Sequence, residues 1–252
     1  RYGSSAASDV YKRQILCSRK FSNIYIKYLC SFIITLGIAL LLSLQPDIGQ
    51  TLLVFFSWSV LIFTSGVSIF LLFFLFSSII LIFFYLIFFV SKFTYIKNRL
   101  ISFIDSETGT YNFQSDKALE SITSGGFFGK GIGEGTLKNR VPEAHTDYII
   151  SVISEEFGVI AIILIFLLFL VFIYSVFKKV NFENNETIKL ILVGSISLIL
   201  MQTIIHIGVN IRLFPTTGMT LPFISYGGSS IISVSILSGI ISVSYTHLRA
   251  HE

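Results

Sequence analysis

Three side chains that exchange protons or bind cations lie close together in one short segment of this chain. Glu143, His145 and Asp147 alternate along Val141–Tyr148, at the end of a polar stretch and directly before an apolar run. If the segment is extended, the three side chains share one face, with successive members about 7 Å apart. Such a set could bind a divalent cation such as Mg²⁺ or Mn²⁺, or could form an acid/base cluster. We therefore expect this segment to carry the chemistry of the protein.

Asp147 can be interpreted in two ways. It stands directly before a long apolar run, where its carboxylate could cap the helix that begins there. The same carboxylate could instead act as a general base. Asparagine caps a helix about as well as aspartate but cannot take a proton. Asp147→Asn should therefore leave a mere cap folded and active, and should abolish general-base catalysis. The spacing alone favours neither interpretation.

A glycine-rich run precedes this segment. Its alternating glycines are Gly129, Gly131, Gly133 and Gly135. Glycines at this density allow backbone conformations closed to other residues and let a ligand approach the chain closely. A phosphate-binding nest is one interpretation, with charge from Lys130, Lys138 and Arg140; a flexible turn at the membrane surface is the other. The run is neither a dinucleotide fingerprint nor a P-loop, because no strand–helix unit surrounds it and glycine follows Lys130.

Polar side chains also interrupt two of the apolar runs. Glu155 and Glu156 lie about two helical turns into the run that follows the polar segment. Carboxylates at that depth are costly and face a cavity or a partner, unless the span begins later and leaves both in the headgroup layer. Gln202, His206 and Asn210 recur every four residues and form one stripe on a helix. The stripe either makes interhelical hydrogen bonds or faces a substrate.

The composition is that of a membrane protein. Hydrophobic residues make up 53% of the chain, charged residues only 13%, and 26 residues are phenylalanine. Soluble domains contain about 25% charged residues. A soluble domain of this length could not bury so much apolar surface, so we expect an all-α polytopic membrane protein. The net charge of +4 does not indicate nucleic-acid binding, and the two cysteines, Cys17 and Cys30, suggest neither a disulfide framework nor a zinc site.

Six apolar runs are expected to cross the membrane as helices. A hydrocarbon core of about 30 Å requires about 20 residues per helix. The run Thr51–Val90 is about twice that length, and we divide it at its polar, glycine-containing break, 64–66. The expected spans are Ile24–Leu44, the two halves of 51–90, Tyr148–Phe177, Ile188–Ile211 and Phe223–Val243.

The connections between the spans carry further signals. Pro46 disfavours helix at the residue before it, and Asp47 can cap the helix that follows. Residues 91–147 are polar, contain no spanning segment and are expected to form one long loop. The stretch 215–230 is rich in small polar residues. Such backbone persists at membrane depth only when it is buried or lines a wet cavity.

Charge distribution predicts the orientation. Lysine and arginine in short loops mark the cytoplasmic side, and both 19–27 and 178–189 have this excess. Counting spans places these regions on one side, so the long loop is expected to be extracytoplasmic. The polar ends resemble linker sequence and are interpreted as non-native. The expected organisation is 1–14 leader, 15–90 with three spans, 91–147 as the loop with the active-site segment, 148–243 with three spans, and 244–252 tail.

Five stretches of the chain occur in a recognisable order: Gln45–Asp47, Gly125–Gly135, Pro142–Asp147, Glu155–Gly158 and Leu221–Ser230. Together they resemble the SEDS family (shape, elongation, division and sporulation), most closely its cell-division branch. The resemblance implies ten membrane helices, and the six expected here look like the fifth to the tenth. It also implies an inverting glycosyltransferase that polymerises lipid II into peptidoglycan strands outside the cytoplasmic membrane.

The resemblance implies roles for individual residues. The essential loop aspartate of the family falls on Asp147, which as a general base would deprotonate the acceptor sugar while a polyprenyl pyrophosphate is released. Lys130, Lys138 and Arg140 are our candidates for binding the pyrophosphate, and a divalent cation could help to neutralise it. Family members commonly have asparagine where this chain has His206.

The predicted site contains three sets of residues. The catalytic residue is Asp147, and no metal ligand is assigned. The predicted substrate-binding residues are Lys130, Lys138, Arg140, Glu143, His145, Gln202, Ser225 and Tyr226. The residues predicted to shape the site are Pro46, Asp47, Gly129, Gly131, Gly133, Gly135, Pro142, Glu155, Pro222, Gly227 and Gly228.

The resemblance further implies partners and a location. These are lipid II and the growing glycan strand, a class B penicillin-binding transpeptidase, other division proteins and membrane lipid, at the septum of the bacterial inner membrane. Two other functions stay open. One is a lipid II flippase, although transporters bind near the membrane midplane and the protonatable cluster here lies at an external surface. The other is a scaffold that activates the transpeptidase without chemistry, for which Asp147→Asn would restore division as well as wild type.

Overall fold

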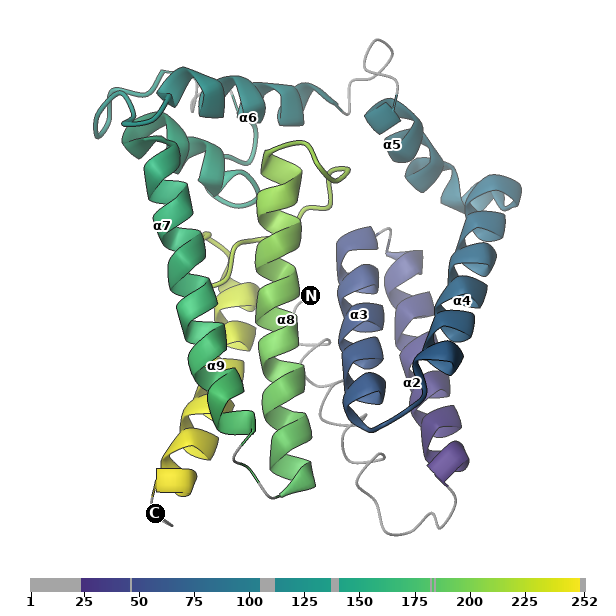
Figure 1. The fold of residues 1–252 in the computed structure, drawn as a ribbon. Coiled ribbons are helices and arrows are strands. Elements are labelled where there is room, and N and C mark those ends of the chain that lie inside the picture. The colour runs from purple at the N-terminus through teal and green to yellow at the C-terminus, as the bar shows by residue number, and fades with distance from the viewer. Residues whose placement is uncertain are drawn as a thin grey trace.

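A computed structural model describes residues 24–45, 47–104, 112–136, 141–181, 183 and 185–249, and regular structure within them is entirely helical. The helices are α2 (Ile24–Leu44), α3 (Ile48–Thr64), α4 (Ile69–Phe89), the 3₁₀ turn η1 (Ser91–Phe93), α5 (Thr94–Ile104), α6 (Asn112–Gly125), α7 (Ile149–Val180), α8 (Glu186–Asn210) and α9 (Gly228–Arg249) (Figure 1). The predicted all-α fold is confirmed.

The core of the molecule surrounds α8, which stands between the α7–α9 pair and α3 (Figure 1). In the most apolar part of α8, 72% of the residues are buried, against 17% in α7. Val54 and Leu61 on α3 are fully buried, as is Ile199 on α8. The exposed leucine and phenylalanine side chains of α4 and α7 form an apolar outer surface, as expected for helices that face lipid.

The described residues contain three helices long and apolar enough to cross a membrane: α2 from Ile26, α7 and α8. A fourth is possible if α4 and α5, bent by 99° at the break between them, count as one span. Helices α3 and α9 are apolar but shorter. The chain is therefore a multi-pass membrane protein, and the count of six spans stays a prediction.

Two predicted helix boundaries are confirmed. α2 ends at Leu44, and the carboxylate of Asp47 caps α3 by accepting a hydrogen bond from Gln50 N at 3.1 Å. The divided apolar run separates at the predicted place, because α3 ends at Thr64 and Gly66 adopts a φ of 87°. Pro46 lies outside the described residues.

Other boundaries differ from the prediction. The last span was expected to begin at Phe223, but α9 begins at Gly228, and Phe223 has a φ of 66°, which a helix does not allow. Residues 244–249 of the predicted tail continue α9. The long polar loop contains two helices, α5 and α6, and α6 packs across the start of α7 (Figure 1). These two helices precede the segment that holds Asp147.

α7 is broken near its start. Gly158 has a φ of 82° and a ψ of 173°, so the helix continues as two pieces on either side of it. Beyond the break, Val159 N donates to Gly126 O at 3.0 Å, outside the helix. Glu155 and Glu156 lie before the break. This favours the interpretation in which the membrane-spanning part of α7 begins after them.

Candidate active site

The segment that holds the predicted catalytic residue is a series of turns. Three successive amides, those of Thr146, Asp147 and Tyr148, donate to Glu143 O at 3.1, 3.1 and 3.3 Å. Glu143 adopts a φ of 55°, in the left-handed region. The segment is therefore not extended, and the condition under which its three ionisable side chains would share one face is not met. Local hydrogen bonds within the segment replace the pairing that an extended chain would need.

The carboxylate of Asp147 does not cap α7. The N-cap position belongs to Tyr148, and no side-chain hydrogen bond caps the helix. Among the described residues, no hydrogen bond reaches the Asp147 carboxylate; Asn210 Nδ2 donates instead to its backbone oxygen at 3.0 Å. A Cβ built on Gly218 would lie 3.5 Å from Asp147 Oδ2, so the carboxylate lies against that glycine. The capping interpretation fails, and the carboxylate stays available for chemistry.

The surroundings of Asp147 favour its protonated form. Burial raises the pKa of Asp147 from 3.8 to about 6, the negative charges of Glu143 and Asp47 act in the same direction, and Arg99 opposes them. A carboxylate with a pKa near the working pH is suited to general-base catalysis. Burial and the neighbouring charge of Asp147 also raise the pKa of Tyr148, so this phenol stays neutral.

A cavity of about 400 Å³ opens beside this segment. It is lined by His145, Ile149, Ile224 and Tyr226. The two sides are joined by a backbone hydrogen bond, in which Tyr226 N donates to His145 O at 3.0 Å. Of the residues predicted to bind substrate, the structure brings His145 and Tyr226 together at this cavity.

The polar stripe on α8 holds loop backbone. Gln202 Nε2 donates to Thr220 O at 2.9 Å, and His206 Nδ1 lies 2.7 Å from Met219 O. Asn210 reaches the active-site segment, as described above. The stripe therefore makes hydrogen bonds. One of them is interhelical, because Gln202 Nε2 also donates to Ser230 Oγ on α9 at 3.4 Å, and the others reach backbone oxygens of Thr220, Met219 and Asp147. Gln202 is only 5% exposed, and its predicted contact with substrate stays a prediction.

The stretch before α9 is organised by its own small residues. Ser225 Oγ accepts a hydrogen bond from Leu221 N at 2.8 Å and is buried, so this hydroxyl shapes the loop. A Cβ on Gly227 would approach Thr220 at 3.1 Å, whereas one on Gly228 would meet open space. Pro222 is buried in the same turn. Exposed Pro142 opens the turns on the other side of the cavity.

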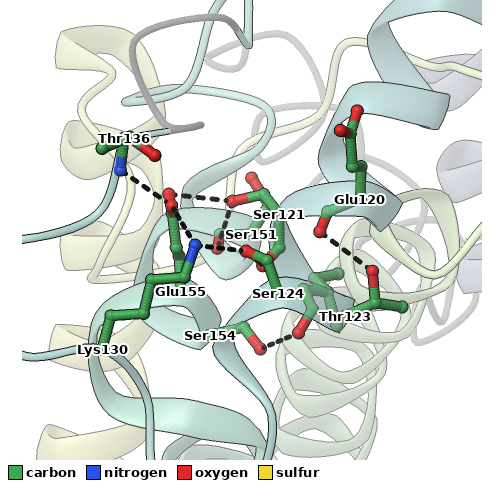
Figure 2. Close-up of polar contacts among 10 residues, drawn as sticks. Glu120, Ser121, Thr123, Ser124, Lys130, Thr136, Ser151, Ser154 and Glu155 are labelled. Atoms are coloured by element: carbon green, nitrogen blue, oxygen red, sulfur yellow. Dashed lines mark hydrogen bonds and ion pairs between the residues drawn. The ribbon is translucent and has the colours of Figure 1, made fainter.

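Glu155 is the centre of a polar network that holds the glycine-rich run (Figure 2). Its carboxylate is completely buried and accepts hydrogen bonds from Thr136 N at 2.8 Å and Ser121 Oγ at 3.2 Å. Lys130 Nζ lies 3.4 Å from the same carboxylate and 3.1 Å from Ser124 Oγ. The Glu155 carboxylate therefore has a cationic partner and polar partners, and it lies before the break in α7.

The glycines of the run allow backbone to pack against backbone. A Cβ on Gly129 would lie 2.2 Å from Glu156 O, and one on Gly135 would lie 2.9 Å from the Glu155 carboxylate. Gly131 and Gly133 have φ values of 116° and 82°, which side chains rarely adopt. These contacts explain the glycines without a bound phosphate. Lys138 and Arg140, the other predicted sources of charge, lie outside the described residues.

Removal of the cation from the buried pair is expected to destabilise the protein. Lys130→Met removes the ion pair that the structure describes at the buried Glu155 carboxylate, which should cost about 1–3 kcal/mol of unfolding free energy. Unfolding of the purified protein in detergent measures this. Lys117→Met, which breaks the exposed pair with Glu120, should cost no more than about 0.5 kcal/mol. Equal effects of the two substitutions would contradict the role given to Glu155.

Sequence reasoning missed one residue of the site. Arg99 lies on α5, inside the region treated as loop, and its Nη1 donates to Thr216 O at 2.8 Å. Its guanidinium stacks on Tyr95, four residues earlier on the same helix, with 4.4 Å to the ring centroid. Tyr95 and Arg99 are four residues apart, and this spacing could have indicated that their side chains contact each other on a helix.

The described residues contain no group of three or more His, Cys, Asp or Glu side chains that could hold a metal ion. Glu143, His145 and Asp147 therefore do not form the divalent-cation site that an extended segment would have allowed.

Comparisons with known proteins show which family this chain resembles. The family model for FtsW, RodA and SpoVE, described as a cell cycle protein, matches residues 6–250. The probable peptidoglycan glycosyltransferase FtsW of Caulobacter vibrioides is 36% identical over 204 residues, which cover 81% of this chain and 51% of that protein. The FtsW of Wigglesworthia glossinidia brevipalpis, also named a probable peptidoglycan glycosyltransferase, is 34% identical, with 89% and 60% covered. The chain thus spans about half the length of the curated relatives that it matches.

Two solved structures share the fold. A chain from a peptidoglycan synthase complex that coordinates polymerization and crosslinking has a TM-score of 0.75 at 25% identity, with 98% of this chain and 68% of that chain covered. The rod shape determining protein RodA of Thermus thermophilus has a TM-score of 0.61 at 25% identity, with 100% and 66% covered. Because the family model matches nearly the whole chain, this protein belongs to the FtsW/RodA/SpoVE family of cell cycle proteins, as its resemblance to the SEDS family indicated.

Proposed function

We propose that this protein polymerises lipid II into peptidoglycan strands, with Asp147 as the general base. One observation carries the proposal: the Asp147 carboxylate has a raised pKa and no hydrogen bond in the described part of the chain. The segment that holds it borders an open cavity through His145 and Ile149. The names of the FtsW relatives support the same reaction class.

The proposed reaction needs one proton transfer and one substitution. The Asp147 carboxylate takes the proton of an acceptor sugar hydroxyl, and the hydroxyl oxygen attacks the anomeric carbon of the donor. A new glycosidic bond forms as the bond between that carbon and the pyrophosphate oxygen breaks. The polyprenyl pyrophosphate leaves with the bonding electrons, and attack from the opposite face inverts the configuration.

The contacts of the described residues favour some of the predicted substrate-binding residues over others. His145 and Tyr226 line the cavity and are the best placed to touch a sugar. Lys130 already has Glu155 as a partner, which makes Lys138 and Arg140 better candidates than Lys130 for binding the pyrophosphate. A divalent cation bound to the substrate's own phosphates would supply further neutralisation.

The proposal includes a partner and a location. The structural neighbour belongs to a complex that coordinates polymerization and crosslinking, which supports a class B penicillin-binding transpeptidase as the partner of this protein. The FtsW relatives support a role in septal wall synthesis at the inner membrane.

The proposal is tested with the protein as its cell makes it, reconstituted in vesicles with lipid II and its transpeptidase. Glycan strands, separated by electrophoresis, should form, and labelled lipid II should not cross the bilayer faster than in vesicles without the protein. Transfer of lipid II across the bilayer without strand formation would reject the polymerase and favour the flippase.

The polymerisation rate should depend on pH through Asp147. The general base must be ionised, and the pKa of Asp147 is raised to about 6. Below that pH, kcat/KM should therefore fall about tenfold per pH unit, and between pH 7 and 8 it should be nearly constant. Initial rates between pH 4.5 and 8 measure this profile. A rate that stays constant down to pH 4.5 would exclude a base of this pKa.

A further inference from the structure

The guanidinium of Arg99 makes two contacts. Its Nη1 donates to Thr216 O at 2.8 Å, and its guanidinium lies over the Tyr95 ring. Its Nε is buried and has no hydrogen-bond partner among the described residues. Arg99 as a whole is half-buried. A partly buried guanidinium is expected to serve a nearby negative charge, because removing a cation from water is costly when no opposite charge compensates it.

The backbone that Arg99 holds continues to the catalytic carboxylate. Two residues after Thr216, the Cα of Gly218 lies against Asp147, where a Cβ would come within 3.5 Å of Oδ2. The same segment is fixed on its other sides, by His206 through Met219 O and by the close packing of Gly49 against Met219. Arg99 therefore anchors one end of a short strip of backbone, 216–219, whose middle touches the base.

The ionisable groups near Asp147 differ from Arg99 in charge. The carboxylate is surrounded by Glu143 and Tyr148 of its own segment and by Asp47 at the start of α3, all negative or neutral. From α8 come neutral Asn210 and the histidine bonded to Met219, and the strip 216–219 carries no ionisable side chain. In the part of the chain that the structure describes, Arg99 is the one cation whose charge acts on Asp147.

We propose that Arg99 is a positioning residue for Asp147: it clamps the strip 216–219 against the catalytic carboxylate and supplies the positive charge that balances Asp47, Glu143 and Asp147. This deepens the proposed glycosyl transfer and rests on it. Without the guanidinium, the carboxylate keeps its proton to higher pH, because two negative neighbours and burial are no longer opposed.

The test compares pH profiles of lipid II polymerisation for three variants of the protein reconstituted with its transpeptidase. Arg99→Gln should move the acid limb of kcat/KM upward by about one pH unit. Arg99→Lys keeps the charge, so its acid limb should stay close to that of wild type while kcat falls. Lys97→Gln is the matched control, because it removes a cation from the same helix, where Lys97 lies over Phe88, and it should leave the profile unchanged.

A second measurement does not depend on activity. Carbodiimides modify protonated carboxyl groups, so the pH at which Asp147 loses its labelling, followed by mass spectrometry, should be higher in Arg99→Gln than in wild type or Lys97→Gln. Labelling curves and acid limbs that coincide for Arg99→Gln and wild type would overturn this role of Arg99 and leave the glycosyltransferase intact. Absence of glycan strands from wild type would instead reject the proposed function, whatever the labelling shows.

Discussion

Gly158→Ala is expected to destabilise the protein by roughly 4 kcal/mol or more. The φ of 82° and ψ of 173° at Gly158 lie in a region essentially restricted to glycine, which costs about 1–3 kcal/mol for other residues. In addition, a Cβ at this position would lie 2.0 Å from Phe127 O, and backbone would have to move. Thermal unfolding in detergent should show a midpoint lower by roughly 10 °C.

Gly133→Ala separates the two causes. Gly133 also has a φ of 82°, but nothing lies within 4 Å of the position that its Cβ would take. Its substitution should therefore cost only the conformational strain, about 1–2 kcal/mol. If the two variants unfold at the same midpoint, the close packing of the glycine-rich run against α7 does not contribute to stability.

Asp147→Asn is expected to abolish function while the protein stays at least as stable as wild type. An amide cannot accept the proton, and loss of a general base typically lowers the rate by about 10²–10⁴-fold. Because burial raises the pKa of Asp147 to about 6, from 3.8, the folded state favours the protonated acid. The stability that this proton gives is present below pH 3.8 and is lost as the pH rises through about 6. At pH 7 to 8 the uncharged amide should therefore unfold no earlier than the ionised carboxylate.

Two readouts test this pair of expectations. In cells depleted of the wild-type protein, Asp147→Asn should fail to restore division, and in detergent its unfolding midpoint at pH 7.5 should equal or exceed that of wild type. Glu134→Gln, which removes an exposed carboxylate from the glycine-rich run, is the control and should restore division. If Asp147→Asn restores division as well as wild type, the protein acts as a scaffold and not through this carboxylate.

The membrane helices were predictable because their signals are local. α2 coincides with the predicted Ile24–Leu44, since the polar residues around Asp47 end one apolar run and cap the next helix. α5 and α6 were missed because neither contains an apolar run of about 20 residues that would mark it in the sequence. The break at Gly158 could not be predicted either, because it depends on hydrogen bonds and close packing with 126–127, some thirty residues earlier in the chain.

The sequence identified candidate residues for the site but did not predict how they are arranged. The sequence singled out Asp147 and offered two interpretations of it, as a helix cap and as a base. A face shared with Glu143 required an extended segment, and the segment is not extended because its amides turn back on Glu143 O. Glu155 was expected to need a partner, but that its partners would include Lys130 required the tertiary structure. Arg99 reaches the site through a contact with Thr216 that no sequence pattern encodes.

The most direct test of the account is the initial rate of strand formation from purified lipid II by wild type and by Asp147→Asn, side by side at pH 7.5 in vesicles that contain the transpeptidase with its own active site blocked. If Asp147 is the general base, wild type forms strands and the variant forms them at a rate at least about 100-fold lower. A variant that polymerises lipid II at the wild-type rate would show that Asp147 is not the base of this reaction.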